Sequence, residues 1–182
     1  MKIKSFKGEY QVYFTENFIQ SLNSVVQNGD IFLIDKNVIE LYREHFLGFK
    51  KSNKIIIIPS GEYSKSFDAA RELIENLMKI GFKRNHRLIA VGGGIVQDAV
   101  AFVASILFRG VQWIFVPTTL LAQGDSCIGS KTSVNFGECK NLLGGFHPPL
   151  EIYIDSSFLS TLSSKEIRSG LGEMLHFFMI GG

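Results

Sequence analysis

Residues 87–119 constrain the fold more than any other part of the chain. They begin with a short apolar run at 88–91, pass into three consecutive glycines at 92–94 and continue as a small, apolar series to residue 104. A second apolar run follows at 113–116. A short apolar run, a glycine turn and a longer apolar series are typical of strand, turn and helix. We therefore predict a strand–helix–strand unit with parallel strands.

The glycine turn favours an anionic ligand. Without Cβ atoms its backbone allows close approach, and the helix N-terminus behind it attracts negative charge. A tight strand–helix turn also needs glycine, and Asp98 would serve equally as a helix-capping residue. Hydroxyl donors and cations in neighbouring loops favour the first reading: Thr118, Thr119, Lys131 and Lys140. A phosphate-bearing ligand is the first hypothesis, although both lysines also suit a solvated surface.

The rest of the chain alternates between strand and helix patterns. We predict one or two edge strands in residues 1–14, further strands at 31–34, 55–58 and 152–154, and helices at 16–26, 38–46, 67–78 and 163–178. Polar residues follow the predicted strands at Asp35, at 60–65 and at Thr118. This alternation predicts an α/β fold, a Rossmann-like and mostly parallel sheet with helices on both faces, whose ligands bind at the carboxyl ends of the strands.

Composition excludes several classes of function. The 182 residues are 46% hydrophobic and 20% charged, as in a globular domain, and the net charge of +2 gives no reason to expect nucleic acid. No apolar run is long enough for a membrane span, and the N-terminus lacks a signal-peptide core, so we expect a cytoplasmic protein without a membrane partner. Cys127 and Cys139 have no metal-binding spacing. Sixteen phenylalanines suggest an apolar face that a second copy, in a homodimer, or a further domain covers.

The last predicted helix carries a candidate metal-binding pair. Ser163 and Glu166 have capping-box spacing at its start. Glu173 and His176 lie three residues apart and so project from one face, a spacing that can supply two metal ligands. The same spacing equally fits a solvated glutamate and an ordinary, partly buried histidine.

Taken together, these residues resemble the sugar-phosphate cyclase family that includes the 3-dehydroquinate synthases, from about residue 31 onward. The resemblance is carried by Pro59-Ser60-Gly61-Glu62, Lys65-Ser66, the glycine turn with Asp98, Arg109-Gly110, the run 116–123, Asp125-Ser126, Lys131-Thr132, Asn135, Lys140-Asn141 and Gly170-Leu171-Gly172-Glu173. So many matches in the same order make the resemblance far more specific than a glycine turn alone.

The resemblance implies NAD and a divalent metal, zinc or cobalt, as cofactors. The family transiently oxidises a sugar-phosphate or heptulosonate-phosphate hydroxyl, eliminates phosphate, returns the hydride and closes a ring. On the cofactor side it implies Asp35 and Asn37 near adenosine, and Glu62 and Lys65 near ribose. The residues Gly93, Gly94 and Ile95, continuing to Asp98, would lie at the diphosphate. The pocket would be completed by Thr118, Thr119, Lys140 and the segment 158–161, which ends at Thr161. On the reaction side it implies Asp125, Lys131, Asn141 and His176 facing the substrate, with Glu173 on the metal.

This sequence departs from the family pattern in four ways. Gln97 and Ser130 stand where the family has glycine, and we expect Gln97 to crowd the diphosphate turn. His176 replaces a substrate-binding lysine and could instead join the metal or carry a proton. The family's two metal-binding histidines lie in a helical C-terminal domain, so we expect a nucleotide domain at 1–162 and the start of that helical domain at 163–182. We expect weak or no turnover by this chain alone, because a C-terminal domain or a second chain is needed to complete the site.

Three other functions remain open from the sequence. They are a related cyclase acting on a different sugar phosphate, a metal-dependent NAD alcohol dehydrogenase, and a non-catalytic nucleotide-binding fragment.

Overall fold

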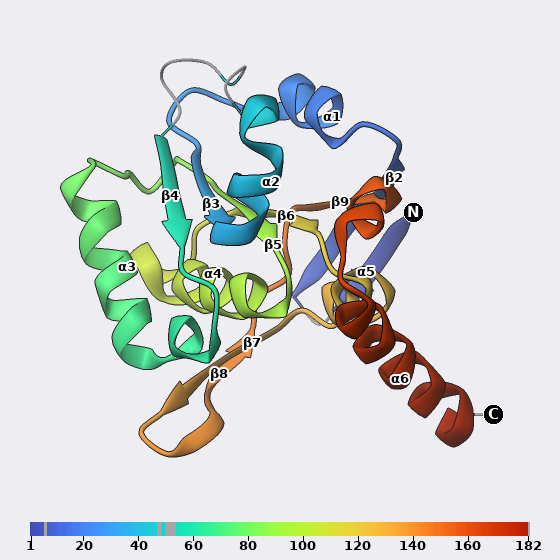
Figure 1. Ribbon diagram of the computed structural model, residues 1–182. Helices are drawn as coiled ribbons and strands as arrows, with labels where there is room; N and C mark the ends of the chain where they lie inside the picture. The colour runs from blue at the N-terminus through green and yellow to red at the C-terminus, as the bar shows by residue number, and fades with distance from the viewer. Residues whose placement is uncertain (6, 47–48, 50–53, 182) are drawn as a thin grey trace.

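A seven-stranded, mostly parallel sheet forms the centre of the protein (Figure 1). The structure is a computed structural model that describes residues 1–5, 7–46, 49 and 54–181. The strand order is β1-β2-β9-β6-β5-β3-β4, and only β1, in this sheet, runs antiparallel to its neighbour. The strands are β1 (Lys2–Ser5), β2 (Gly8–Thr15), β3 (Ile31–Asp35), β4 (Lys54–Ile58), β5 (Leu88–Gly92), β6 (Trp113–Pro117) and β9 (Glu151–Asp155). The predicted fold class is confirmed.

Helices cover both faces of this sheet. α1 (Phe18–Val25) and α2 (Lys36–Phe46) lie on one face, and α3 (Phe67–Lys79) and α4 (Gly94–Ile106) lie on the other. Two further helices, α5 (Leu120–Gly124) and α6 (Ser164–Gly181), pack against each other. Four 3₁₀ turns complete the described chain: η1 (Glu62–Lys65), η2 (Leu107–Arg109), η3 (Ser126–Ile128) and η4 (Ser156–Thr161). Each predicted helix is present, with ends that differ by a few residues from the prediction.

Alternation along the buried strands divides the core into two layers. Leu88 and Ala90 of β5 belong to the layer under α3 and α4, whereas Ile89 and Val91 face α1 and α2. All four side chains are fully buried. Because successive strand residues point to opposite faces, a continuous apolar run supplies both layers at once. The runs that the sequence analysis took as buried strands therefore make the two halves of the core.

A buried ion pair fixes the amino ends of two central strands. Arg87 precedes β5 and donates from Nη2 to Asp30 Oδ2 at 2.6 Å, immediately before β3. The same nitrogen donates to the Val25 carbonyl at the end of α1 at 2.6 Å. Breaking a buried pair leaves an uncompensated charge in the interior, which costs about 3–5 kcal/mol. The pair thus holds β3, β5 and α1 in register from the end of the sheet where β5 begins.

The N-terminal strands differ in part from their prediction. β1 is an edge strand and pairs in antiparallel fashion with β2. β2, in contrast, pairs in parallel with β9 and is an inner strand of the sheet. Val12 of β2 is fully buried, which matches an inner position. Apolar alternation was too loose in this segment to separate an edge from an inner strand.

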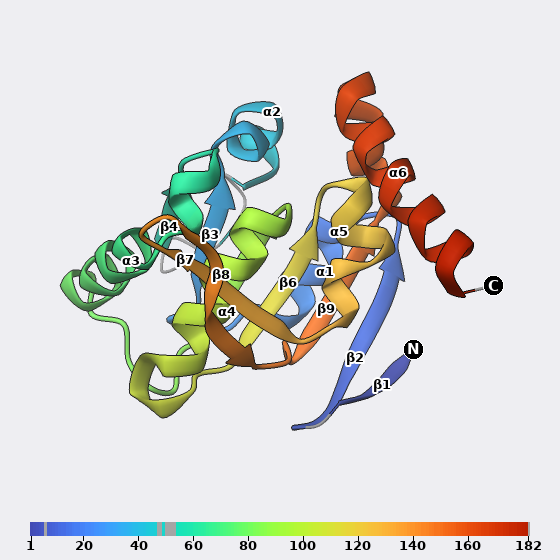
Figure 2. The same cartoon turned by 90° about the horizontal axis from the view of Figure 1, so that it is seen from below.

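An antiparallel hairpin, β7 (Lys131–Phe136) and β8 (Cys139–Phe146), forms a second sheet beside α4 (Figure 2). Lys131 and Lys140 were expected in loops, whereas both lie on strands of this hairpin, which was not predicted. A Cβ on Gly144 would lie 1.8 Å from the Thr132 carbonyl oxygen, so the two strands can approach this closely only with glycine there. The hairpin matters because several candidate site residues lie on it.

Helix α6 packs against α5 and extends away from the sheet (Figure 2). The predicted capping box is confirmed: Ser163 N donates to Glu166 Oε2 at 2.8 Å, and Glu166 N donates to Ser163 Oγ at 3.3 Å. A Cβ on Gly170 would lie 2.8 Å from Leu120 Cβ, so glycine permits the close contact of α5 and α6. Among the helices that the structure describes, no segment has the length and apolar character of a membrane span.

Candidate functional site

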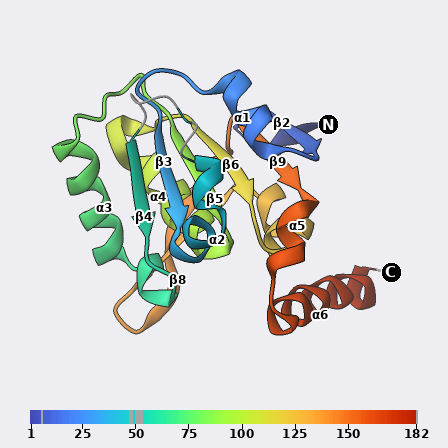
Figure 3. The ribbon, with the colours of Figure 1, turned by 45° about the horizontal axis from the view of Figure 1, so that its top comes forward.

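A first cavity of about 520 Å³ lies at the carboxyl ends of the central strands. The strand order of the sheet reverses between the neighbouring strands β3 and β5. Parallel α/β sheets bind their ligands at such a topological switch point. Figure 3 shows β3 running directly into α2, which forms one wall. Eight of the predicted cofactor residues line this cavity: Asp35, Asn37, Gly93, Gly94, Ile95, Thr118, Thr119 and Thr161.

The glycine turn presents bare backbone to this cavity. Gly93 is the N-cap of α4, and in the described structure no side chain caps the helix there. A Cβ on Gly93 would lie 2.8 Å from Thr119 Cγ2, so a larger residue would press on the neighbouring wall. A Cβ on Gly94 would meet no described atom within 4 Å, which leaves open space at the helix N-terminus. The first amides of a 13-residue helix therefore face a cavity that can take an anion.

Hydrogen bonds order the rim of the first cavity. Asp35 Oδ1 accepts from Asn37 N at 2.8 Å and from Ser60 Oγ at 3.3 Å, which joins the ends of β3 and β4. Across the opening, the hydroxyls of Tyr42 and Thr161 lie 3.0 Å apart. The two halves of the rim thus come from residues more than a hundred positions apart in the sequence.

Sequence reasoning did not assign several residues of this rim to the site. The cavity is also lined by Val38, Leu41, Tyr42, Ser60, Gly61, Leu162, Ser163 and Glu166. Hydrogen bonds from Ser163 lower the pKa of Glu166, so its carboxylate stays ionised at neutral pH. The capping-box spacing was a usable signal for Ser163 and Glu166, because it places them just after Thr161.

A second cavity of about 810 Å³ lies on the other side of the first turn of α4. Its lining is more highly charged: Lys65, Asp98, Asp125 and Lys131, together with Gln97, Ser126, Ile128, Gly129, Thr132, Ser133, Asn141, Leu142, Gly144, Gly145 and Phe146. All three residues expected to face substrate from the main part of the chain, Asp125, Lys131 and Asn141, are therefore in one cavity.

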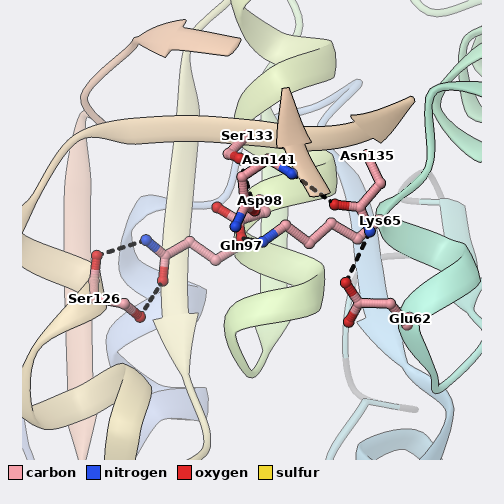
Figure 4. Close-up of polar contacts among 8 residues, drawn as sticks. All are labelled: Glu62, Lys65, Gln97, Asp98, Ser126, Ser133, Asn135 and Asn141. Atoms are coloured by element: carbon pink, nitrogen blue, oxygen red, sulfur yellow. Dashed lines mark hydrogen bonds and ion pairs between the residues drawn. The ribbon is translucent and has the colours of Figure 1, made fainter. Parts of the chain in front are cut away.

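An ion pair joins η1 to α4 in the second cavity (Figure 4). Lys65 Nζ lies 2.7 Å from Asp98 Oδ2, and both side chains are largely buried. Burial raises the pKa of Asp98, and the hydrogen bond and charge of Lys65 oppose that rise. Both residues were expected near the cofactor, and in the structure they lie in the wall of the second cavity.

A chain of hydrogen bonds links η1 to the hairpin (Figure 4). Asn135 Nδ2 donates to Glu62 Oε1 at 2.8 Å, and Asn135 Oδ1 accepts from Asn141 N at 2.9 Å. Ser133 Oγ then donates to Asn141 Oδ1 at 2.9 Å. Asn141 has φ of 54°, in the left-handed region that asparagine tolerates better than most residues. Glu62 lines neither cavity in the described structure, and it anchors the hairpin beside both.

Gln97 does not lie in the wall of the first cavity beside the glycine turn. Its side chain is 4% exposed, lines the second cavity and forms two hydrogen bonds with Ser126 (Figure 4). The expectation that it crowds the glycine turn was wrong, because Ser126 of η3 holds its side-chain amide on the side of the second cavity. Ser130, the second departure from glycine, is buried and has φ of 57°.

Besides Glu62, three predicted residues line neither cavity of the described structure. Lys140 is exposed on β8, and Glu173 and His176 are exposed on α6. Within the described ranges no group of three or more His, Cys, Asp or Glu side chains could hold a metal ion. A tetrahedral zinc or cobalt site needs more donors than Glu173 and His176 provide. The residues present do not by themselves fit a complete metal site.

The fold and the two cavities define the class of protein as a Rossmann-like α/β domain with two neighbouring cavities at the first turn of α4. The chain matches the family described as 3-dehydroquinate synthase N-terminal over residues 55–169. It is 41% identical over 187 residues to the 3-dehydroquinate synthase of Alkaliphilus oremlandii, a match covering 99% of this chain and 52% of that protein. The corresponding enzyme of Methylacidiphilum infernorum is 40% identical over 188 residues, with 99% and 52% covered.

Solved structures show the same relationship. A 2-deoxy-scyllo-inosose synthase complexed with carbaglucose-6-phosphate, NAD+ and Co2+ has a TM-score of 0.82 at 27% identity, covering 96% of this chain and 50% of that one. The 2-epi-5-epi-valiolone synthase of Streptomyces hygroscopicus subsp. jinggangensis 5008, with NAD+ and Zn2+ bound, has a TM-score of 0.81 at 31% identity, covering 91% and 48%. This chain belongs to the 3-dehydroquinate synthase N-terminal family, and it spans about half the length of the curated relatives it matches.

Proposed function

We propose that this chain is the nucleotide-binding part of an NAD-dependent sugar-phosphate cyclase of the 3-dehydroquinate synthase type. One observation carries the proposal: the first turn of α4 separates two cavities, with Gly93, Gly94 and Ile95 lining one and Gln97 and Asp98 lining the other. A cofactor and a substrate bound in these cavities would lie on opposite sides of one helical turn. Transfer of a hydride requires such close placement.

The first cavity fits the dinucleotide. The diphosphate would bind at the α4 N-terminus, where Gly94 leaves open space and the helix dipole favours negative charge. Thr118 and Thr119 offer hydroxyl groups on one side, while Asp35 at the end of β3 suits a ribose hydroxyl on the adenosine side. NAD bound there would accept a hydride from the substrate carbon that carries a hydroxyl group, while the hydroxyl loses its proton, and would return the hydride later in the cycle.

The second cavity fits a phosphorylated sugar or heptulosonate. Lys131 and Asn141 supply a cation and an amide for phosphate and hydroxyl oxygens, and Asp125 supplies a carboxylate that accepts hydrogen bonds from hydroxyl groups. The Lys65–Asp98 pair adds a fixed dipole beside the glycine turn. Oriented charges of this kind stabilise the charge that develops when a proton leaves carbon and phosphate departs.

The metal site is also a proposal, and it rests on residues of α6 that line neither of the two cavities. We propose that Glu173 is one metal ligand and that residues 163–182 begin a helical domain. His176 lies one turn further along α6 and is a second candidate donor, or a group facing the substrate. The described residues do not complete a metal site, so further donors would have to come from outside them.

Ligand binding and product analysis test this function. Calorimetry with NAD and with a heptulosonate phosphate should show binding of both by the chain. Turnover by the chain alone should be absent, and when the chain is combined with the C-terminal half of a relative we expect inorganic phosphate without net NADH. Net NADH would instead favour the alcohol dehydrogenase alternative, and failure to bind NAD would contradict the proposal.

A further inference from the structure

Gln97 connects the first turn of α4 to the wall of the second cavity. Its amide nitrogen donates to the Ser126 carbonyl at 2.6 Å, and its amide oxygen accepts from the Ser126 hydroxyl at 2.8 Å. Both halves of one buried primary amide are therefore used on one residue (Figure 4). A carboxylate cannot donate the first bond, and an apolar side chain can make neither.

Ser126 begins the turn that carries Asp125. Asp125 joins α5 to η3 with φ of −143° and ψ of −72°, outside both the helical and the extended regions. Its main-chain nitrogen donates to the Leu121 carbonyl, and its carbonyl accepts from Ile128 N. These local bonds close the turn upon itself. Gln97 adds a bond from a different element and so ties the turn to α4.

We propose that Gln97 is a positioning residue: by holding Ser126 against α4, it fixes where Asp125 stands in the second cavity. This inference rests on the proposed function, because it assigns the second cavity to a sugar phosphate. A glycine, which the family pattern has at this position, offers no side chain for either bond. This chain therefore orders its substrate-side wall by a contact that the family pattern does not provide.

The first turn of α4 contacts two different walls of the second cavity. Gln97 reaches the η3 side, while the adjacent Asp98 pairs with Lys65 on the η1 side. The turn also begins at Gly94, in the wall of the first cavity. Loss of the Gln97 contact should therefore loosen one wall of the second cavity and leave the wall of the first unchanged.

Thiol labelling gives a direct measure of the turn. Cys127 follows Ser126 and is buried, and burial raises the pKa of its thiol to about 12, so a thiol reagent reacts with it only when the turn opens. Cys139 is exposed and serves as the internal control. Gln97→Met keeps the side-chain volume but removes both hydrogen bonds, and Gln97→Gly restores the residue of the family pattern.

We expect both variants to label Cys127 about tenfold faster or more, with Cys139 unchanged, because two hydrogen bonds of ordinary strength are lost. We also expect Gln97→Met to weaken heptulosonate-phosphate binding about tenfold and NAD binding by less than twofold. Ser126→Ala, which keeps only the bond to the carbonyl, should lie between wild type and Gln97→Met. Denaturant unfolding of each variant checks that the chain is folded.

Two results would overturn the positioning role. One is a Cys127 labelling rate in Gln97→Met equal to that of wild type. The other is faster labelling with unchanged sugar-phosphate affinity, which would make Gln97 a stabilising residue only. If the wild-type chain binds NAD but the variants show none of these effects, only the inference about Gln97 is refuted. If the wild-type chain binds neither ligand, the proposed function is refuted. Labelling of Cys127 still decides in that case whether Gln97 holds the turn.

Discussion

The two cavities are built in different ways. The first contains a bare glycine turn and short residues at strand ends, such as Gly93, Gly94 and Thr118, with apolar and aromatic side chains such as Leu41 and Phe158 around them. The second is lined by long polar side chains, including Lys65, Gln97 and Asp98, and by a hairpin whose second strand is largely exposed. Gln97, the departure from the family pattern that can be placed in a cavity, lies in the second one.

This difference shows which part of the site the fold alone determines. A cradle of main-chain amides follows from the strand–turn–helix connection, so it persists as long as the sheet does. A wall of side chains can change residue by residue without changing the fold. The first cavity, proposed to hold the cofactor, should therefore match that of relatives closely, and the second cavity, proposed to hold the substrate, is where this chain is free to differ.

The largest expected effect is on the first cavity. Gly94→Asp would place a carboxylate in open space at the α4 N-terminus, where the diphosphate is proposed to bind. We expect NAD affinity to fall about 100-fold or more, because the new carboxylate would occupy the space proposed for the diphosphate and repel its negative charge. Calorimetry with NAD measures this, and the unfolding midpoint should change little since the position is uncrowded.

A matched variant separates charge from bulk at this position. Gly94→Ala adds one methyl group and no charge, and we expect it to weaken NAD about tenfold at most. If Gly94→Asp binds NAD as tightly as Gly94→Ala does, the diphosphate does not bind at the N-terminus of α4. The difference between the two cavities would then not correspond to a cofactor site and a substrate site. Sugar-phosphate affinity should be the same in both variants.

A smaller effect should follow from breaking the ion pair of the second cavity. In Lys65→Met, Asp98 loses the partner that opposes the rise of its pKa. A group whose pKa is raised on folding stabilises the protein below its unfolded value and loses that contribution as pH rises through the folded value. We therefore expect a loss of about 1–3 kcal/mol at pH 8 that shrinks toward pH 4.

The double variant Lys65→Met/Asp98→Asn is the control for this pair. It removes the buried charge as well as its partner, so most of the stability at pH 8 should return. Urea unfolding at both pH values gives the comparison. Ligand binding sharpens it further: if Lys65→Met weakens NAD more than the sugar phosphate, these residues serve the cofactor, as the sequence analysis had it, and not the second cavity that they line.

The sequence predicted the parts of the molecule that follow from local patterns. Continuous apolar runs gave β3, β5 and β6, and their polar ends gave Asp35 and Thr118. Because parallel strands end at the same edge of a sheet, these residues were correctly expected near one another. The capping box of α6 was equally local, and it too was correct.

The parts that were missed depend on contacts between distant segments. The β7–β8 hairpin has no regular alternation, and its pairing depends on the close approach of Gly144 to Thr132. The orientation of Gln97 follows from its place on the helical turn and from Ser126, 29 residues away. No local pattern encodes either contact. The residues of the second cavity could therefore be suspected from the sequence, but their arrangement could not be predicted.

The smallest expected effect concerns Glu166, which lines the first cavity without being needed to form it. Its carboxylate accepts from Ser163 N and Ser163 Oγ, and these bonds lower its pKa. A group whose pKa is lowered on folding stabilises the protein above its unfolded value, 4.5, and loses that contribution as pH falls through the folded value. Because Glu166 is exposed, Glu166→Ala should cost at most about 1 kcal/mol at pH 7.

Glutamine at this position keeps the capping geometry but not the charge. Glu166→Gln should therefore cost only a few tenths of a kcal/mol at pH 7, and the difference between it and wild type should disappear near pH 3. Thermal unfolding at the two pH values measures this, with NAD affinity expected to stay within twofold. A large loss of NAD affinity in Glu166→Gln would show that a side-chain charge, and not the main-chain cradle alone, holds the ligand of the first cavity.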